Sequence, residues 1–307
     1  MKLYFAPMEG ITKYTYRNAH AEYFGGVDAY YAPFVSPSEN DKVNAKHFRD
    51  ILPENNKAGE LIPQILTNSY SRFEHFEKLI DELGYKKANI NLGCPSGTVV
   101  KRGKGSGFLR EPELLEMFLD EVFEKSQLTL SIKTRTGYFS GEEMKKLMEI
   151  YNKYSYAKLI IHPRAREDKY NGVPDMEVFK KAYDISKNKV SYNGNVFSKQ
   201  RYEEIIEEYP DLDSVMIGRG AIMNPAIFRE IRGGAPLCKK ELIEFTDLLR
   251  ARYVELYKSE SFTLKKLKEI WTYVMWSFPD EKKIAKELRK ANELEEFMNA
   301  AKRMPEF

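Results

Sequence analysis

The stretch that decides the fold is residues 88–96, ANINLGCPS, a short apolar run followed by a turn and a cysteine. Its first part, Ala88–Leu92, predicts a buried strand. Gly93 permits a sharp turn, and Pro95 fixes the backbone directly after the Cys94 thiol. Most free cysteines are small buried hydrophobic residues, but a thiol held at the end of a strand is also positioned for chemistry.

Seven further runs of the same kind occur in the first three quarters of the chain. They are Leu3–Ala6, Ala29–Ala32, Ile62–Leu66, Leu128–Lys133, Lys158–His162, Val190–Asn193 and Ser214–Ile217. Amphipathic segments with helical spacing lie between most of them. These are Ser71–Leu83, Glu111–Lys125, Gly141–Tyr154, Met176–Ile185 and Lys199–Tyr209.

Alternating strands and helices predict an α/β fold with a parallel sheet, and eight such units in this length predict a (β/α)8 TIM barrel. The main alternative is a doubly wound open sheet. That alternative is weakened because no Gly-x-Gly-x-x-Gly motif follows the first strand. The glycine-rich residues 103–107 are expected to form a flexible loop.

The pattern changes near residue 236, after which helical segments follow one another without strands. They are Glu241–Lys258, Thr263–Ser277, Glu281–Ala291 and Leu294–Arg303. We therefore predict a catalytic barrel domain over residues 1–235 and a small helical-bundle domain over residues 236–307. The aromatic residues Trp271, Tyr273 and Trp276 have ordinary core spacing and are expected to form the core of that bundle.

Composition narrows the class of protein. The 307 residues are 42% hydrophobic, and the net charge of +3 predicts that any nucleic-acid surface is a local patch. Two cysteines argue against a disulfide framework and fit a reducing compartment. No run is long enough to span a bilayer, and the apolar N-terminal run is too short for a signal peptide. We expect a cytoplasmic protein with no membrane, metal site or obligate protein partner.

Polar residues follow nearly every predicted strand. In strand order they are Pro7-Met8-Glu9 after the first, Gln64 inside the third, and then, at the strand ends, Asn91 with Cys94, Lys133 with Arg135, His162 with Arg164, Asn193-Gly194-Asn195 and Gly218-Arg219-Gly220. Each has an ordinary structural explanation on its own, but reactive groups of a (β/α)8 barrel gather at the carboxyl ends of its strands. The glycines after the last two strands, with Arg219 as a charged clamp, predict a phosphorylated cofactor or substrate.

At these residues the chain resembles the tRNA-dihydrouridine synthases, a flavin-dependent family. The matching stretches are APMEGIT at 6–12, NLGCP at 91–95, IKTR at 132–135, HPR at 162–164, NGN at 193–195 and IGRG at 217–220. They occur in the family's order over about the first 230 residues, and the helical tail is similar to the family's RNA-binding domain. The chain departs from the family at Pro163, where glycine is commoner, and at Asn195, where an acidic residue is usual.

The resemblance implies reduction of the C5–C6 double bond of uridines in tRNA, with FMN bound and NADPH as the source of electrons. Hydride transfer is chemistry that side chains cannot perform, so a flavin is needed. The hydride would pass from flavin N5 to C6, and Cys94 would give a proton to C5. A thiol with that task should not have a strongly lowered pKa.

The resemblance also assigns roles to the residues after the strands. Pro7 and Met8 should pack on the flavin ring, Gln64 and Lys133 should bond its polar edge, and His162 should lie near it. The phosphate should be held by Asn193, Gly194, Asn195, Gly218 and Arg219. Substrate contacts are expected from Asn91, Lys101, Arg102, Arg135 and Arg164, with Lys104 among the basic residues beside the Cys94 loop.

Three other functions stay open from the sequence. One is another FMN barrel, an ene-reductase or dehydrogenase that acts on a small molecule. Another is an aldolase-type barrel in which Lys133 forms a Schiff base. The third is a tRNA-binding protein without catalytic activity.

Overall fold

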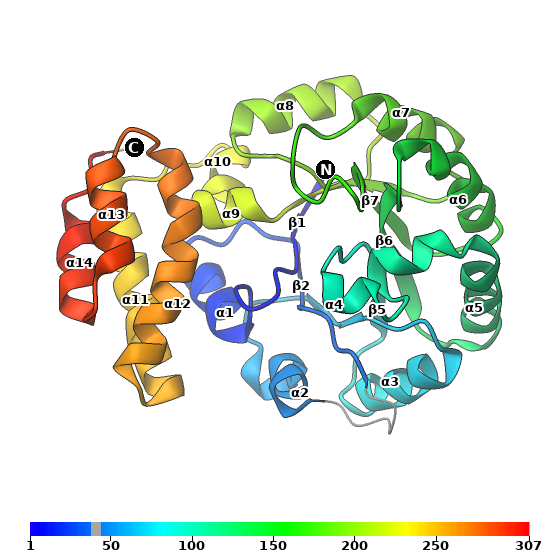
Figure 1. Ribbon diagram of the computed structural model, residues 1–307, viewed down its shortest axis with the longest axis horizontal. Coiled ribbons are helices and arrows are strands. Elements are labelled where there is room, and N and C mark those ends of the chain that lie inside the picture. The colour runs from blue at the N-terminus through cyan, green and yellow to red at the C-terminus, as the bar shows by residue number, and fades with distance from the viewer. Residues whose placement is uncertain (38–43, 307) are drawn as a thin grey trace.

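The structure is a computed structural model that describes residues 1–37 and 44–306, without the side chain of Lys46. Within these residues nine parallel strands form one sheet, which curls into a cylinder surrounded by helices (Figure 1). The strands are β1 (Lys2–Phe5), β2 (Ala29–Tyr31), β3 (Leu61–Ile62), β4 (Gln64–Ile65), β5 (Lys87–Leu92), β6 (Thr129–Gly137), β7 (Lys158–Ala165), β8 (Val190–Tyr192) and β9 (Ser214–Ile217).

The cylinder closes at Pro63. The sheet order is β3-β2-β1-β9-β8-β7-β6-β5-β4, so the two outermost strands are neighbours in the chain with only Pro63 between them. Proline has no N–H to give to a ladder, which explains why the expected strand Ile62–Leu66 is two short strands. Val35 completes the closure, because its N–H donates to Gln64 O at 2.7 Å and its carbonyl accepts from Leu66 N at 2.9 Å. The predicted TIM-barrel fold is confirmed.

Helices on the outside of the barrel follow most strands. The longer ones are α1 (Tyr14–Tyr23), α2 (Ala45–Ile51), α3 (Tyr70–Glu82), α5 (Pro112–Lys125), α6 (Met144–Tyr151), α7 (Met176–Ile185) and α8 (Lys199–Glu208). Short ones are α4 (Gly97–Val100), α9 (Arg219–Met223), α10 (Ile227–Ile231) and the 3-10 helices η1 (Pro53–Asn55), η2 (Gly105–Arg110) and η3 (Gly141–Glu143). Helix α1 was not predicted, because Arg17 and His20 are fully buried and obscure its apolar periodicity.

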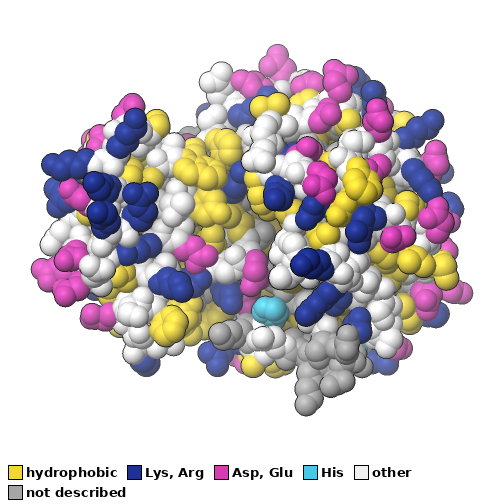
Figure 2. Space-filling view, in the orientation of Figure 1, with side chains coloured by type: hydrophobic (Ala, Val, Ile, Leu, Met, Phe, Trp, Pro, Cys, Tyr) yellow, Lys and Arg dark blue, Asp and Glu magenta, His cyan; other side chains and the backbone are white. Residues whose placement is uncertain are grey.

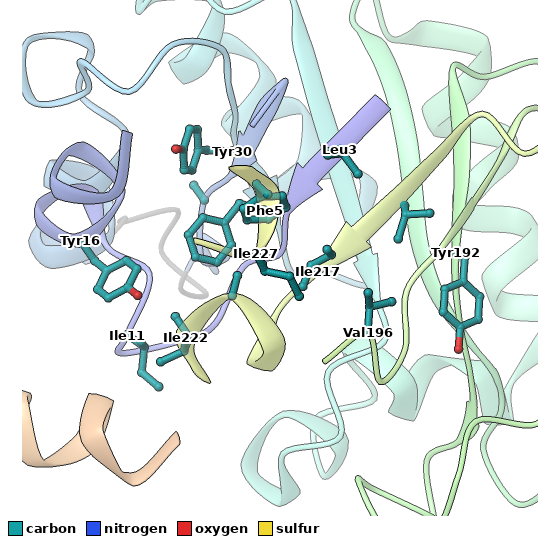
Figure 3. Close-up of a cluster of buried hydrophobic side chains, with 14 of the residues drawn as sticks. Leu3, Phe5, Ile11, Tyr16, Tyr30, Tyr192, Val196, Ile217, Ile222 and Ile227 are labelled. Atoms are coloured by element: carbon teal, nitrogen blue, oxygen red, sulfur yellow. The ribbon is translucent and has the colours of Figure 1, made fainter. Parts of the chain in front are cut away.

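Side chains alternate between the interior of the barrel and its helical coat. Tyr4 of β1 belongs to an interior cluster with Tyr31, Ile160 and Met216, whereas its neighbour Phe5 packs outward. Figure 3 shows Phe5 in the outer layer, on the side that faces Tyr16 of α1 and Ile222 and Ile227 of α9 and α10. The ring centroids of Phe5 and Tyr16 are 6.0 Å apart. This alternation leaves the polar residues that follow the strands at the rim.

The C-terminal helices pack as a bundle against one side of the barrel, beside α1 and α9 (Figure 1). They are α11 (Lys239–Tyr257), α12 (Glu260–Val274), the 3-10 turn η4 (Met275–Ser277), α13 (Lys282–Lys290) and α14 (Leu294–Lys302). Phe245 of α11 packs on Tyr16 of α1, with ring centroids 5.7 Å apart. The division of the chain at residue 235 stays a prediction. None of the described helices has the combined length and apolar content that crossing a bilayer requires.

Candidate active site

A cavity of about 790 Å³ opens at the carboxyl ends of the strands. Its wall contains the thiol, the amine and the amides that the sequence singled out. From the prediction it includes Pro7, Met8, Gln64, Asn91, Cys94, Lys133, Arg135, His162, Asn193, Gly194, Asn195, Gly218 and Arg219. The wall does not include Lys101, Arg102 or Arg164. Most of the predicted residues therefore share one site, although they come from seven different strand ends.

Two polar side chains hold the loop that carries Cys94. The Oδ1 atom of Asn91 accepts from the backbone N–H groups of Gly93 at 3.0 Å and Cys94 at 2.9 Å. On the other side, Ser106 donates to the Cys94 carbonyl from Oγ at 2.8 Å and from its backbone N at 3.1 Å. The thiol therefore sits on a backbone with fixed geometry.

The prediction of a flexible loop at residues 103–107 was wrong. Residues Gly105, Ser106 and Gly107 are buried and begin the 3-10 helix η2. Gly105 has φ +57°, and a Cβ there would lie 2.8 Å from the Cys94 carbonyl oxygen. Glycine is thus required for close approach to the Cys94 loop rather than for mobility.

A chain of amides runs through the barrel interior beneath the thiol. Asn91 Nδ2 donates to Gln64 Oε1 at 2.7 Å, and Gln64 Nε2 donates to Asn89 Oδ1 at 2.6 Å. Asn89 Nδ2 then donates to Ser131 Oγ at 2.8 Å. Buried polar groups need such partners, and the chain fixes the amide of Gln64 at the floor of the cavity.

Burial raises the pKa of the Cys94 thiol above its ordinary value, although the nearby Arg135 and Lys133 favour the thiolate. The thiol is therefore protonated at neutral pH. This direction agrees with the expectation for a proton donor. The other cysteine, Cys238, is exposed at the start of α11, outside the cavity wall.

Lys133 lies on β6 directly beside Asn91 of β5 in the sheet register. Burial lowers the pKa of Lys133 to about 7, and the adjacent Arg135 contributes in the same direction. The pKa of His162 is well below its ordinary value because the ring is buried and faces Arg135 and Lys133. Arg164 Nη1 donates to His162 Nε2 at 2.9 Å, so the neutral ring carries its proton on Nδ1.

Arg135 and Arg164 are only 1% and 2% exposed, and most of their hydrogen bonds go to backbone carbonyls. Arg135 donates to Gly93 O at 2.9 Å, to Ala165 O at 3.0 Å and to Lys169 O at 2.7 Å. Arg164 donates to the carbonyls of Asn171 and Gly172 at 3.1 and 2.6 Å. The structure thus gives both side chains a role in holding the loop after β7. Their contact with substrate stays a prediction.

The opposite end of the cavity carries Arg219 and the glycine-containing loops after β8 and β9. Arg219 Nη2 donates to Asn195 Oδ1 at 2.8 Å, and Asn195 has a positive φ of 32°. Asn193 Nδ2 donates to Met216 O at 2.8 Å, which ties the β8 loop to β9. A Cβ at Gly218 would lie 3.3 Å from the Cβ of Ala6, so a larger residue would crowd the loop after β1.

Basic residues near the Cys94 loop divide into two groups. Lys101 and Arg102 are exposed on the turn after α4. Lys104, which the sequence analysis grouped with them, is only 7% exposed, and its Nζ donates to Ser36 Oγ at 3.2 Å. Lys104 is therefore mainly a structural contact, whereas the other two residues remain available at the rim.

Five aromatic residues of the cavity wall, among the residues that the structure describes, were not predicted there: Phe34, Tyr170, Phe197, Tyr273 and Trp276. Trp271 is buried in the helical bundle against Phe297, as expected. Tyr273 is partly buried and packs against the same core, but it also lines the cavity. The expectation was wrong for Trp276, which is 45% exposed and lines the cavity. Residues 273 and 276 are three apart and share a helix face that residue 271 does not. That offset was the available signal in the sequence.

The family model described as dihydrouridine synthase (Dus) matches residues 4–306. The chain belongs to the dihydrouridine synthase family. A probable tRNA-dihydrouridine synthase from Staphylococcus aureus (strain MRSA252) is 28% identical over 271 residues, which cover 86% of this chain and 80% of that protein. The tRNA-dihydrouridine synthase B of Pasteurella multocida (strain Pm70) is 25% identical, over 74% of this chain and 68% of that protein. The predicted family is confirmed, and this dihydrouridine synthase family member is an oxidoreductase.

Solved structures with the same fold include morphinone reductase in complex with tetrahydroNAD, at a TM-score of 0.51 and 11% identity over 77% of this chain and 88% of that one. Histamine dehydrogenase from Rhizobium sp. 4-9 gives a TM-score of 0.52 at 10% identity, over 76% of this chain and 45% of that one. At such identities the likeness concerns the fold of this family member, not its chemistry.

Proposed function

We propose that the protein reduces uridines of tRNA to 5,6-dihydrouridine with bound FMN and with electrons from NADPH. The observation that carries the proposal is the placement of the Cys94 thiol and the Lys133 amine in one cavity, on the ends of adjacent strands. Family membership and the names of the curated relatives support the same reaction.

The residues of the cavity fit FMN in size and in charge. A volume of about 790 Å³ is within the usual range for a cofactor site. Among the residues that the structure describes, its wall holds the basic side chains Lys133, Arg135, Lys169 and Arg219 and one carboxylate, that of Glu9, which suits a ligand with a phosphate group. We assign Pro7 and Met8 to the ring, and Asn193, Gly194, Asn195, Gly218 and Arg219 to the phosphate.

FMN bound in this cavity would supply the hydride, which no side chain can provide. Cys94 is protonated and partly buried, so it can hold a proton for C5 of the uracil until the hydride reaches C6. Lys133, whose pKa of about 7 allows both charge states, would stabilise negative charge at the polar edge of the ring together with Gln64. Neutral His162 lines the same cavity and would offer Nδ1–H as a hydrogen-bond donor to the bound flavin.

A uracil inside folded tRNA must leave its stack to reach a cavity at the end of a barrel. Asn91 lines that cavity and keeps one N–H free after donating to Gln64, so we assign it to the uracil edge. Figure 2 shows Lys and Arg side chains around the centre of the face above α4 and over the outer helices of the bundle. The exposed basic residues of α13 are Lys282, Lys283, Lys286, Arg289 and Lys290. Together with Lys101 and Arg102 they would contact RNA phosphates.

The decisive experiment combines an absorption spectrum with a product assay. The purified protein should show a flavin spectrum. With unmodified tRNA and NADPH it should form dihydrouridine, detected by nucleoside mass spectrometry, and the Cys94→Ala variant should form it far more slowly. A flavoprotein that reduces small activated alkenes but leaves tRNA unchanged would overturn the proposal in favour of a small-molecule reductase. Binding of tRNA without flavin or turnover would leave only an RNA-binding protein.

A further inference from the structure

The guanidinium of Arg219 is enclosed by aromatic rings from three separate parts of the chain. Its Cζ lies 4.8 Å from the ring centroid of Tyr170, 5.6 Å from that of Phe197 and 5.8 Å from that of Trp276. Tyr170 belongs to the loop after β7 and Phe197 to the loop after β8. Trp276 belongs to η4, at the end of the bundle helix α12. Each distance is within the range of a cation–π interaction.

The bundle contributes a second ring to this enclosure. Tyr273 of α12 lines the cavity, and its ring centroid lies 5.0 Å from that of Trp276. Trp276 packs edge-on against Phe197 at 6.2 Å. Figure 2 shows hydrophobic side chains along the seam where α12 meets the barrel near α9. The helical bundle is therefore one wall of the cavity.

Among the described residues, most N–H donors of Arg219 are left without a hydrogen-bond acceptor. Nη2 donates to the neutral amide of Asn195 at 2.8 Å, and the aromatic faces accept no further conventional hydrogen bond from the guanidinium plane. A guanidinium has five N–H donors in a planar fork that matches phosphate. Rings stacked about it restrict its orientation, so less conformational freedom is lost when an anion binds.

We propose that Trp276, supported by Tyr273, is a positioning residue that holds Arg219 toward the cofactor phosphate, so that the helical bundle completes the cofactor site. This inference rests on the proposed function, because it takes the phosphate of FMN as the ligand of Arg219. Trp276 acts through Arg219 and need not touch the cofactor. Its side chain is 45% exposed, so its replacement should leave the fold intact.

The test compares FMN with riboflavin, which has the same ring but no phosphate, by calorimetric titration of apoprotein. Trp276→Ala should weaken FMN binding by about threefold to tenfold, the scale of a partly exposed cation–π contact, and leave riboflavin binding unchanged. Trp276→Phe should restore most of the FMN affinity. In an Arg219→Met background, Trp276→Ala should have no further effect, because the two residues act through one interaction.

Phe262→Ala is the matched control, because Phe262 is a 60% exposed aromatic residue at the other end of α12. It should bind FMN as the unmodified protein does. The inference is overturned if Trp276→Ala binds FMN normally, or if it loses FMN and riboflavin equally. If the unmodified apoprotein binds neither flavin, the proposed function itself fails, which is a different result from a normal FMN preference that Trp276 does not influence.

Discussion

The Nε atom of Arg135 donates to the carbonyl oxygen of Gly93 at 2.9 Å, directly before Cys94 in the chain. The same guanidinium donates to Lys169 O at 2.7 Å and lies over the ring of Tyr170 at 5.3 Å. One buried side chain therefore connects the loop that carries the thiol to the loop that carries an aromatic wall of the cavity. The position of the thiol depends on this connection as much as on its own strand.

Arg135→Met should release both loops. Its loss leaves the carbonyls of Gly93 and Lys169 without their charged donor, at a cost of about 1.5–3 kcal/mol in the free energy of unfolding. The rate of dihydrouridine formation should fall by more than the loss of folded protein explains, because the loop that carries the Cys94 thiol is no longer fixed. Arg135→Lys keeps the positive charge but loses the planar guanidinium with its several N–H donors. Its stability and its turnover should therefore lie between those of the unmodified protein and those of Arg135→Met. Urea unfolding and single-turnover kinetics check this, and equal rates in all three proteins would contradict it.

Cys94→Ala should lower the rate of dihydrouridine formation by about 10²- to 10⁴-fold while flavin content stays the same, since a general acid has been removed. Cys238→Ser is the control, because that exposed thiol caps α11 and serine preserves a cap. Alkylation as a function of pH should place the Cys94 pKa above its ordinary value, since burial disfavours the thiolate. A reactive thiolate at pH 7 would argue against the proposed role.

Lys133 should make FMN binding depend on pH. The amine has a pKa of about 7 in the free protein, and it is therefore mostly neutral at pH 8. Hydrogen-bond acceptors on the polar edge of the flavin ring favour the protonated amine, so binding at pH 8 should take up a proton, and affinity should fall by up to about tenfold per pH unit above 7. Calorimetry in buffers with different ionisation enthalpies measures the uptake. Lys133→Met should abolish it, and the absence of uptake in the unmodified protein would refute this role.

The same pKa shift predicts the stability of the apoprotein. Lys133 is neutral in the folded state above about pH 7, whereas in the unfolded chain it stays protonated up to its ordinary pKa of 10.5. The unfolded state therefore binds more protons between these values, and the free energy of unfolding should contain a contribution that rises with pH across this window. Lys133→Met should lack that contribution, as paired urea titrations at pH 7 and pH 9 can show.

Asn91→Ala should destabilise the turn that carries Cys94. The variant leaves the N–H groups of Gly93 and Cys94 without their acceptor, which costs about 1–3 kcal/mol for a buried group. Asn91→Asp keeps the acceptor but loses the donation to Gln64, so it should retain the turn and disturb the amide chain. Cys94 alkylation should be faster in the alanine variant than in the aspartate variant, and the reverse order would count against this account.

Lys101 and Arg102 should contribute to RNA affinity through phosphate contacts. Replacing both with alanine should reduce the slope of log affinity against log salt by about 1–2, since each lost contact removes roughly one released counterion. The charge-matched control is the Lys86→Ala, Lys87→Ala double variant, which lies at the start of β5 and hence at the other mouth of the barrel. Equal slopes for the two double variants would show that the Cys94 rim does not contact RNA.

Much of the site could be predicted from the sequence because residues that follow successive strands of a parallel barrel lie at the same rim. Cys94, Lys133 and His162 each follow an apolar run of strand length, and parallel strands bring their carboxyl ends to one rim. Each of the stretches quoted for the family resemblance therefore contributes at least one residue to the same cavity. Strand β9 and helix α7 matched their predicted bounds, since their patterns are local and end at clear boundaries.

The remaining features depend on contacts between segments that are distant in the chain. Arg135 and Arg164 are charged in sequence but buried in the fold, because loop carbonyls from residues 93 and 165–172 reach them. Gly105 has the composition of a mobile loop, yet it is required for packing on Cys94. Trp276 reaches the cavity only because the bundle docks beside α9.

By itself, the sequence determined the alternation of strands with helices, the family and the chemical groups at the strand ends, all of which are encoded in local periodicity and motif. Only the tertiary structure decided which basic side chains are buried and hydrogen-bond loop carbonyls, which ones stay exposed, and which part of the cavity wall the helical bundle supplies. The physical reason is that burial and hydrogen-bond partners are set by long-range packing, which residue spacing does not encode.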